Sequence, residues 1–139
     1  MAIRVVRLGT PRVAGEGIRL GTVRRPPRGV PKRDFARRDF YDVWLPELAP
    51  SASTVSWALS EPWTPARWQR YERTYLKEMG TPAARHLIEV LAALSKDTNF
   101  SVGCYCEDAS RCHRSLLARL LREAGAEMAD DSPAGESPA

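Results

Sequence analysis

The spacing of apolar residues predicts strands near the start of the chain. Residues 2–8 are mostly apolar, and residues 18–24 alternate apolar and polar side chains as a half-buried strand does. Residues 40–46 form a third strand candidate that ends at a proline. The segment 25–31 contains three prolines and one glycine, so it is predicted to be a stiff loop.

Three helices are predicted in the middle of the chain. Ser51 or Ser53 can cap a short helix that runs to about residue 59. Thr64 and Thr81 each precede a proline, which places a capping hydroxyl just before the first helical residue. Apolar residues then recur at helical spacing in both segments, on Trp68, Tyr71, Tyr75 and Met79 in the first and on Leu87, Ile88, Leu91 and Leu94 in the second.

A last strand and a last helix enclose a polar turn. Residues 99–105 are predicted to form the strand and residues 111–124 an amphipathic helix. The order of elements indicates an α/β fold, with a small three-layer (αβα), mixed and largely parallel sheet in which the 99–105 strand is central. We expect a single domain over residues 1–125 and a disordered acidic tail over residues 126–139.

The composition limits the class of protein. With 139 residues the chain can build one core. No stretch approaches the roughly 20 apolar residues of a membrane span, and the N-terminus lacks the apolar core of a signal peptide. The odd number of cysteines favours free thiols in a reducing compartment. We therefore expect a cytoplasmic protein with no membrane partner.

The positive charge is concentrated at the start of the chain. Residues 1–40 contain eleven arginine and lysine side chains and three acidic ones, whereas residues 127–139 contain four acidic side chains and no basic one. This asymmetry predicts an anionic ligand, such as a nucleotide or nucleic acid, although an arginine-rich surface without a partner explains it equally well. Arginine dominates over lysine, and arginine is the better bidentate ligand of phosphate.

All three cysteines and one of the two histidines fall within residues 104–113. Cys104, Cys106, Cys112 and His113 offer four metal ligands, the number of a structural zinc site. Their spacing is unfavourable, because Cys104 and Cys106 are one residue apart on a strand and adjacent residues on a helix diverge by about 100°. We therefore expect no metal and no cofactor.

Nucleophilic catalysis is a second interpretation of this segment. Cys112 is expected in the first turn of the last helix, with Ser110 as its cap, where the helix dipole and the neighbouring basic side chains favour a thiolate. In an enzyme, Cys112 would attack, His113 would carry the proton, and Glu107 or Asp108 would orient the histidine.

Anion binding without a reaction is a third interpretation. Free backbone N–H groups at 111–113 would bind phosphate or carboxylate together with the side chains of Arg111, Arg114 and Ser115. Arg24 and Arg28, on the proline loop, would add two more guanidinium groups. A purely structural role also remains open, since free cysteine is among the most buried residue types.

Four segments together carry a family resemblance. They are residues 27–30 (Pro-Arg-Gly-Val), residues 41–51 (Tyr-Asp-Val-Trp-Leu-Pro-Glu-Leu-Ala-Pro-Ser), the helix with Trp68, Tyr71 and Tyr75, and residues 112–115 (Cys-His-Arg-Ser). In these the chain resembles the YeaO-like family, domain of unknown function 488, over nearly its whole length except the tail. Family members usually read Asp-Arg-Leu-Trp-Pro-Arg-Gly before the loop, whereas residues 23–29 keep the arginines and lose the acid and the tryptophan.

The resemblance implies a small α/β fold and a common pocket around Arg24, Arg28, Cys112, His113 and Arg114. It implies no established reaction. The leading hypothesis is a phosphate-binding or anion-binding pocket for a nucleotide or a nucleic-acid end. Both a pocket that only binds this ligand and one in which a cysteine also reacts with it are consistent with the sequence. The alternative is a non-catalytic nucleic-acid-binding module that uses residues 1–40 as a basic face.

Overall fold

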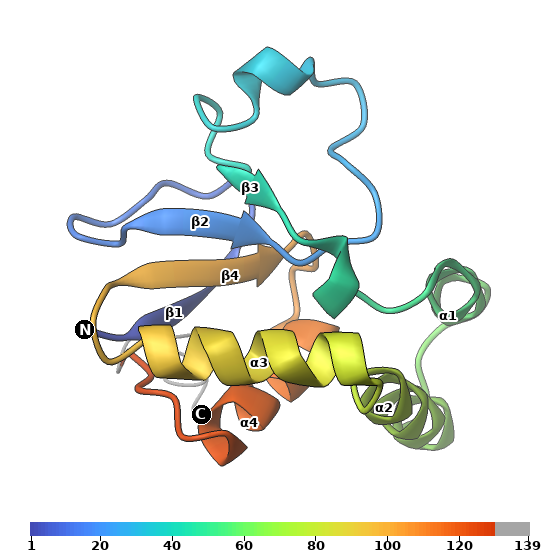
Figure 1. Cartoon of the computed structure of the whole chain (residues 1–139). Helices are drawn as coiled ribbons and strands as arrows, with labels where there is room; N and C mark the ends of the chain where they lie inside the picture. Colours follow the sequence, from blue (N-terminus) through green and yellow to red (C-terminus); the bar gives the residue numbers. More distant parts are fainter. Residues whose placement is uncertain (130–139) are drawn as a thin grey trace.

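Four parallel strands form one sheet in the order β1-β4-β2-β3. The strands are β1 (Ile3–Arg7), β2 (Ile18–Gly21), β3 (Val43–Trp44) and β4 (Phe100–Cys104). The coordinates are a computed structural model that describes residues 1–129. The α/β class and the central position of β4, parallel to β1 on one side and β2 on the other, confirm the prediction from the sequence (Figure 1).

The helices begin where their capping residues predict. They are α1 (Ala52–Leu59), α2 (Pro65–Glu78), α3 (Pro82–Leu94) and α4 (His113–Glu123), with short 3-10 turns η1 (Lys32–Asp34), η2 (Pro46–Leu48) and η3 (Ala109–Arg111). The Ser51 side chain accepts a hydrogen bond from the Thr54 N–H, and that of Thr64 accepts one from Arg67. The placement of Cys112 in the first turn of the last helix is wrong, because α4 begins at His113 and Cys112 is its extended N-cap residue.

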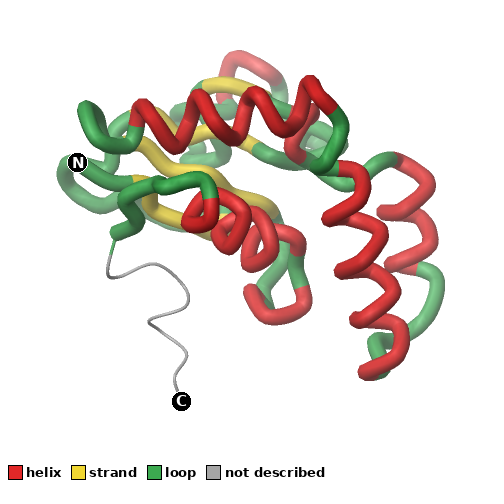
Figure 2. The backbone as a smooth tube through the Cα atoms, turned by 60° about the horizontal axis from the view of Figure 1, so that its bottom comes forward, coloured by secondary structure: helices red, strands yellow, loops and turns green. Residues whose placement is uncertain are grey.

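Helices α3 and α4 cover one face of the sheet, and α2 packs beside them against the same core. Ile3 and Val5 of β1 lie opposite Phe100 and Val102 of β4, and all four side chains are buried against apolar residues of α2, α3 and α4. Figure 2 shows α3 and α4 over the strands, with α1 and α2 set to one side. In this arrangement α2, α3 and α4 share one core with the sheet, which buries the apolar stripes predicted from the sequence.

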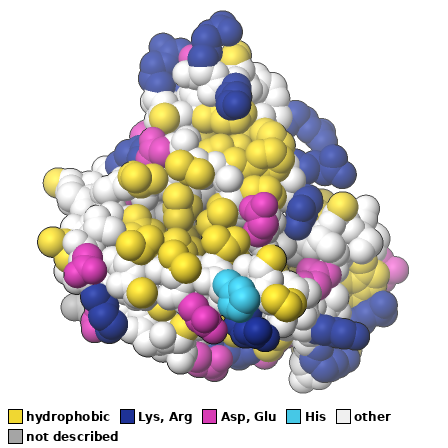
Figure 3. All heavy atoms as spheres, in the orientation of Figure 1, with side chains coloured by type: hydrophobic (Ala, Val, Ile, Leu, Met, Phe, Trp, Pro, Cys, Tyr) yellow, Lys and Arg dark blue, Asp and Glu magenta, His cyan; other side chains and the backbone are white. Residues whose placement is uncertain are grey.

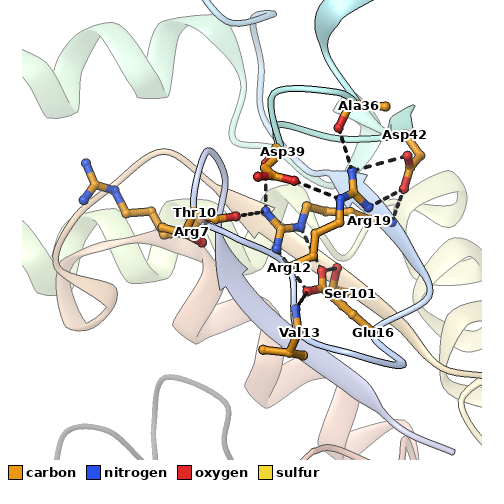
Figure 4. A network of polar contacts seen from close by, with 10 residues as sticks. All are labelled: Arg7, Thr10, Arg12, Val13, Glu16, Arg19, Ala36, Asp39, Asp42 and Ser101. Carbon is orange, nitrogen blue, oxygen red and sulfur yellow. Dashed lines mark hydrogen bonds and ion pairs between the residues drawn. The ribbon is translucent and has the colours of Figure 1, made fainter.

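Loops and η1, instead of helices, cover the other face. There the Arg19 side chain is fully buried and its Nε donates to Glu16 Oε2 over 2.8 Å. The Ser101 hydroxyl donates to the same Glu16 oxygen over 2.6 Å. Arg19 also donates to the carbonyls of Thr10 and Asp39, so this ion pair fastens two long loops to the sheet (Figure 4). The third layer of the fold is therefore built from irregular segments.

The segment after α4 continues the structure beyond the predicted end of the domain. The Ile3 N–H donates to the Glu127 carbonyl, and the Ala129 N–H donates to the Ile3 carbonyl, both over 2.8 Å. Met128 thereby forms a parallel bridge with Ile3 at the edge of β1. Residues 126–129 thus belong to the sheet edge and not to a disordered tail; the rest of the predicted tail lies outside the described residues.

Membrane insertion by a helix finds no support in this fold. Among residues 1–129, none of the helices combines the length and the apolar character that a membrane span requires.

Candidate functional site

The carboxyl ends of the parallel strands meet at one edge of the sheet, where ligands bind in many α/β proteins. The chain leaves β2 through Val23, Arg24 and Arg25, and it leaves β4 through Tyr105 and Cys106. Helices α1 and α2 lie beyond this edge (Figure 1). A cavity of about 410 Å³, open to solvent, lies between the two strand ends and the two helices.

Arginines from two segments line the cavity. Arg25 is exposed at its mouth, and Arg111 places its guanidinium 5.8 Å from the centre of the Trp68 ring. Arg24 also lines it, but its Nε donates to the Pro50 carbonyl over 2.9 Å and its Nη2 to the Pro46 carbonyl over 3.1 Å. Arg24 therefore holds the connection between η2 and α1, and Arg25 and Arg111 are the lining arginines for which no such backbone contact is seen within residues 1–129.

Aromatic side chains form the opposite wall. The rings of Trp63 and Tyr71 lie 5.3 Å apart, edge to face, and Trp68 stacks on Tyr71 at the same distance. The Tyr105 ring closes another side, and its hydroxyl donates to the Arg25 carbonyl over 2.9 Å. The helical spacing of Trp68 and Tyr71 in the sequence predicts that both belong to the core. The same spacing is expected for an aromatic residue that also lines a cavity, so the sequence did not identify Tyr71 as a lining residue.

His113 is buried at the base of the cavity. Its Nε2 lies 2.6 Å from the Thr22 carbonyl oxygen, so Nε2 carries the proton and Nδ1 has a free lone pair. Burial lowers the pKa of His113 to about 4, with Arg114 adding to the effect and the Thr22 hydrogen bond opposing it. The imidazole is therefore neutral at neutral pH.

The predicted acid partners of this histidine lie elsewhere. The Glu107 carboxylate lies 4.0 Å from Arg7, and the Asp108 carboxylate caps η3 by accepting from Ser110. A carbonyl, that of Thr22, occupies the position that the sequence assigned to a carboxylate. The structure thus does not assemble the arrangement of Cys112, His113 and an acid that nucleophilic catalysis would use.

The three cysteines differ in access. Cys112 is only 1% exposed and packs with Leu8, Val23 and Tyr41. Cys104 is fully buried, and the structure pairs its sulfur with that of Cys112 as a disulfide. Cys106 is exposed and lines the cavity together with Cys104. Of the three, Cys106 has the sulfur that a molecule in solution can reach.

Cys106 nevertheless has the character of a protonated thiol. Desolvation by the surrounding backbone raises its pKa, and the charges of Arg114 and Arg7 only partly offset this effect. A thiol with a raised pKa is a weak nucleophile at neutral pH. The environment of Cys106 therefore favours contact with a ligand over attack on it.

Other predicted anion ligands lie outside this cavity. Arg114 is buried, and its Nη2 donates to the Cys106 carbonyl over 2.9 Å. The Ser115 hydroxyl donates to the Cys112 carbonyl over 2.9 Å, and the Arg111 N–H, which was predicted to be free, donates to the Asp108 carbonyl over 3.1 Å. Arg28 is exposed on the proline loop. Among the predicted residues, the structure brings Arg24, Arg111 and His113 to one cavity and leaves Arg28, Arg114, Ser115 and Cys112 outside its wall.

Comparison with known proteins gives the family and no more. No curated protein and no solved structure matches the chain significantly. The family described as the active DUF488-N3 subclade matches residues 3–125, a range that includes every strand, every helix and the whole cavity wall. The resemblance to YeaO-like proteins fits the same family, and the chain therefore belongs to the DUF488 family of domains of unknown function.

Proposed function

We propose that the cavity at the carboxyl edge of the sheet binds a small ligand that joins an anionic group to an aromatic ring, as a nucleotide or a nucleic-acid end does. One observation carries the proposal: Arg25 and Arg111 line the same cavity as Trp63 and Tyr71. Arginine pairs with phosphate oxygens, and aromatic rings stack on bases.

The size and lining of the cavity support a small ligand. Its volume of about 410 Å³ falls within the range of roughly 300–1,000 Å³ that such sites have. Most of its wall is apolar, with Val23, Val55 and Leu59 beside the aromatic rings, and a few charged groups stand at its mouth. That combination is typical of a site in which apolar burial gives affinity and polar groups give orientation.

The proposed function is ligand binding and does not include a covalent reaction. The neutral His113, the protonated Cys106 and the buried Cys112 give little support to covalent catalysis. A reaction at this site would have to involve Cys106, the accessible thiol, and alkylation of Cys106 in the presence of the ligand reports directly on its proximity.

Two arginines of the proline loop provide a matched test. Arg25 and Arg28 are both exposed, but Arg25 borders the cavity and Arg28 does not. In calorimetric titrations with nucleoside 5′-monophosphates, Arg25→Gln should weaken binding about tenfold or more, because a hydrogen bond to a charged group contributes about 1.5–3 kcal/mol. Arg28→Gln should leave the affinity nearly unchanged. Equal losses in both variants, or no binding of any monophosphate by the wild-type chain, would refute the proposal.

A basic lobe supports the alternative function. Lys and Arg side chains gather around the projecting segment that carries η1, at the top of Figure 3. The exposed basic residues of this segment are Arg25, Arg28, Lys32, Arg33, Arg37 and Arg38. Such a group attracts the phosphate backbone of nucleic acids without reading its sequence. The alternative is thus a nucleic-acid-binding module that uses this basic lobe and not the cavity.

A further inference from the structure

The three cysteines near the end of β4 form a cluster in the structure, although their spacing in the sequence did not favour a metal site. Strand β4 ends at Cys104, so the chain is free to turn before Cys106, and the extended Cys112 reaches back from the start of α4. The three sulfur atoms consequently lie within 4.8 Å of one another. The objection that Cys104 and Cys106 are one residue apart on a strand does not apply, because β4 ends at Cys104 and Cys106 lies beyond it.

The backbone spacing suits a bridge that is longer than a disulfide. The Cα atoms of Cys104 and Cys112 are 7.9 Å apart, whereas disulfides span about 4.4–6.8 Å. Two thiolates that share one zinc ion at about 2.3 Å have their sulfurs about 3.8 Å apart, which lengthens the bridge accordingly. When the pair is reduced, a common ion shared by these side chains therefore fits the observed spacing of the backbone.

The surroundings balance the charge of such a site. Three thiolates around a divalent cation carry one net negative charge. The buried guanidinium of Arg114 supplies one positive charge directly behind the cluster, where it is held by the Cys106 and Glu107 carbonyls. Buried charge is tolerated when it is compensated at short range in this way.

His113 supports the cluster from the side of Cys112. Its Nδ1 lies 3.8 Å from the Cys112 sulfur, while its Nε2 donates to the Thr22 carbonyl. A carbonyl that fixes the orientation and the tautomer of an imidazole is a frequent second partner at metal sites. In the absence of an ion, Nδ1 can accept a hydrogen bond from the Cys112 thiol.

We propose that Cys104, Cys106 and Cys112 bind one thiophilic divalent cation, zinc being the ion that such ligands usually take. Sites with three protein ligands keep a further position for water or a ligand. Because Cys104 and Cys106 also form part of the cavity wall, that position lies where a molecule in the cavity can reach it. This inference is independent of the proposed anion binding, since it concerns the metal alone.

The test uses the full chain purified with reductant and probed with zinc and cobalt ions. The wild-type protein should hold about one zinc per chain, and its cobalt form should show the thiolate charge-transfer absorption of tetrahedral sulfur coordination. Cys106→Ser is the informative variant, because Cys106 is exposed and its replacement leaves the buried sulfurs in place. It should weaken zinc binding at least about tenfold.

His86 provides the control for adventitious binding. It is the other histidine of the chain and is exposed on α3, away from the cluster. His86→Gln should bind zinc as the wild type does. Equal zinc affinities of the wild type and Cys106→Ser, or a wild-type protein that retains no zinc and whose melting temperature is unchanged by chelator, would overturn the proposal. So would a mass two hydrogens short in reductant, which would identify Cys104 and Cys112 as a persistent disulfide.

Discussion

At the scale of single residues, Arg19 is a charged side chain that is fully buried and paired in the interior. Its side chain is fully buried and donates four hydrogen bonds, two of them to Glu16. The basic face predicted over residues 1–40 includes Arg19, because composition alone does not distinguish an exposed arginine from a buried, paired one. Burial opposes the ionisation of Glu16, but the hydrogen bonds from Arg19, Ser101 and the Val13 backbone outweigh it and lower its pKa.

This lowered pKa makes the stability of the fold depend on pH. A carboxyl group whose pKa is lower in the folded state contributes stability above its unfolded value of 4.5, and the contribution is lost as the pH falls through the folded value. Ser101→Ala removes one hydrogen bond to Glu16 and should raise the pKa of that carboxyl. In urea unfolding as a function of pH, stability at neutral pH should then fall by about 1–3 kcal/mol. The further loss of stability on acidification should be smaller than in the wild type and should be complete at a higher pH.

Ser110→Ala is the matched control for this variant. The Ser110 hydroxyl also donates to a carboxylate over 2.6 Å, but its partner Asp108 is exposed. An exposed pair is screened by water and contributes little. The Ser110→Ala protein should therefore retain the pH dependence of the wild type, and a similar shift in both variants would mean that Glu16 does not govern acid unfolding.

At the scale of elements, the sequence predicted the helices better than the irregular segments. The starts of α1 and α2 follow from the local chemistry of Ser51 and Thr64, which cap the neighbouring N–H groups. The strand predicted over residues 40–46 is only Val43–Trp44 in the structure. Its length depends on hydrogen bonds to β2, which is far away in the sequence, and local sequence does not predict such pairing. The segment 126–129 joins the sheet for the same reason, because its partner Ile3 lies at the other end of the chain.

The edge formed by residues 126–129 predicts a measurable effect of proline. Ala129→Pro removes the N–H that donates to the Ile3 carbonyl, and it should lower the free energy of unfolding by about 1 kcal/mol. The neighbouring bond from the Ile3 N–H to Glu127 should loosen too, so exchange of the Ile3 amide hydrogen should accelerate. Ala129→Val keeps the donor and favours an extended backbone. If the proline and valine variants exchange this amide alike, the edge pairing does not exist in solution.

At the scale of the whole molecule, the sequence predicted several of the residues that line the cavity, but not which of the predicted residues lie together in space. The predicted succession of strand, polar turn and helix is confirmed, and Cys106, Arg111 and His113, which follow β4, all line the cavity. Which arginines would converge there depended on the path of the loop after β2, which brings Arg25 to the cavity and leaves Arg28 outside. The cysteine cluster depended on where β4 ends, and strand ends are among the least predictable features of a sequence.

The distribution of positive charge is the second property of the whole molecule. Arg12 pairs with Asp39 and Asp42, and Arg19 is buried with Glu16. These arginines of residues 1–40 therefore stabilise the fold through ion pairs and do not add to an exposed basic surface. The exposed remainder is concentrated in the basic lobe around η1 (Figure 3). Arg25 belongs to both surfaces, but the other basic residues of the lobe do not line the cavity, so the two proposed functions are distinguishable.

Salt dependence decides between these functions. If single-stranded nucleic acid binds the six exposed basic residues of the lobe, the logarithm of the affinity should fall with the logarithm of salt concentration with a slope no steeper than about −4. Replacing Arg28, Arg33 and Arg38 by glutamine should reduce that slope by about 2, as measured by anisotropy of a labelled oligonucleotide. The same triple variant should bind nucleoside monophosphates like the wild type, because none of these three residues borders the cavity. An unchanged slope would exclude the lobe as a nucleic-acid surface, and a parallel loss of monophosphate binding would show that lobe and cavity act as one site.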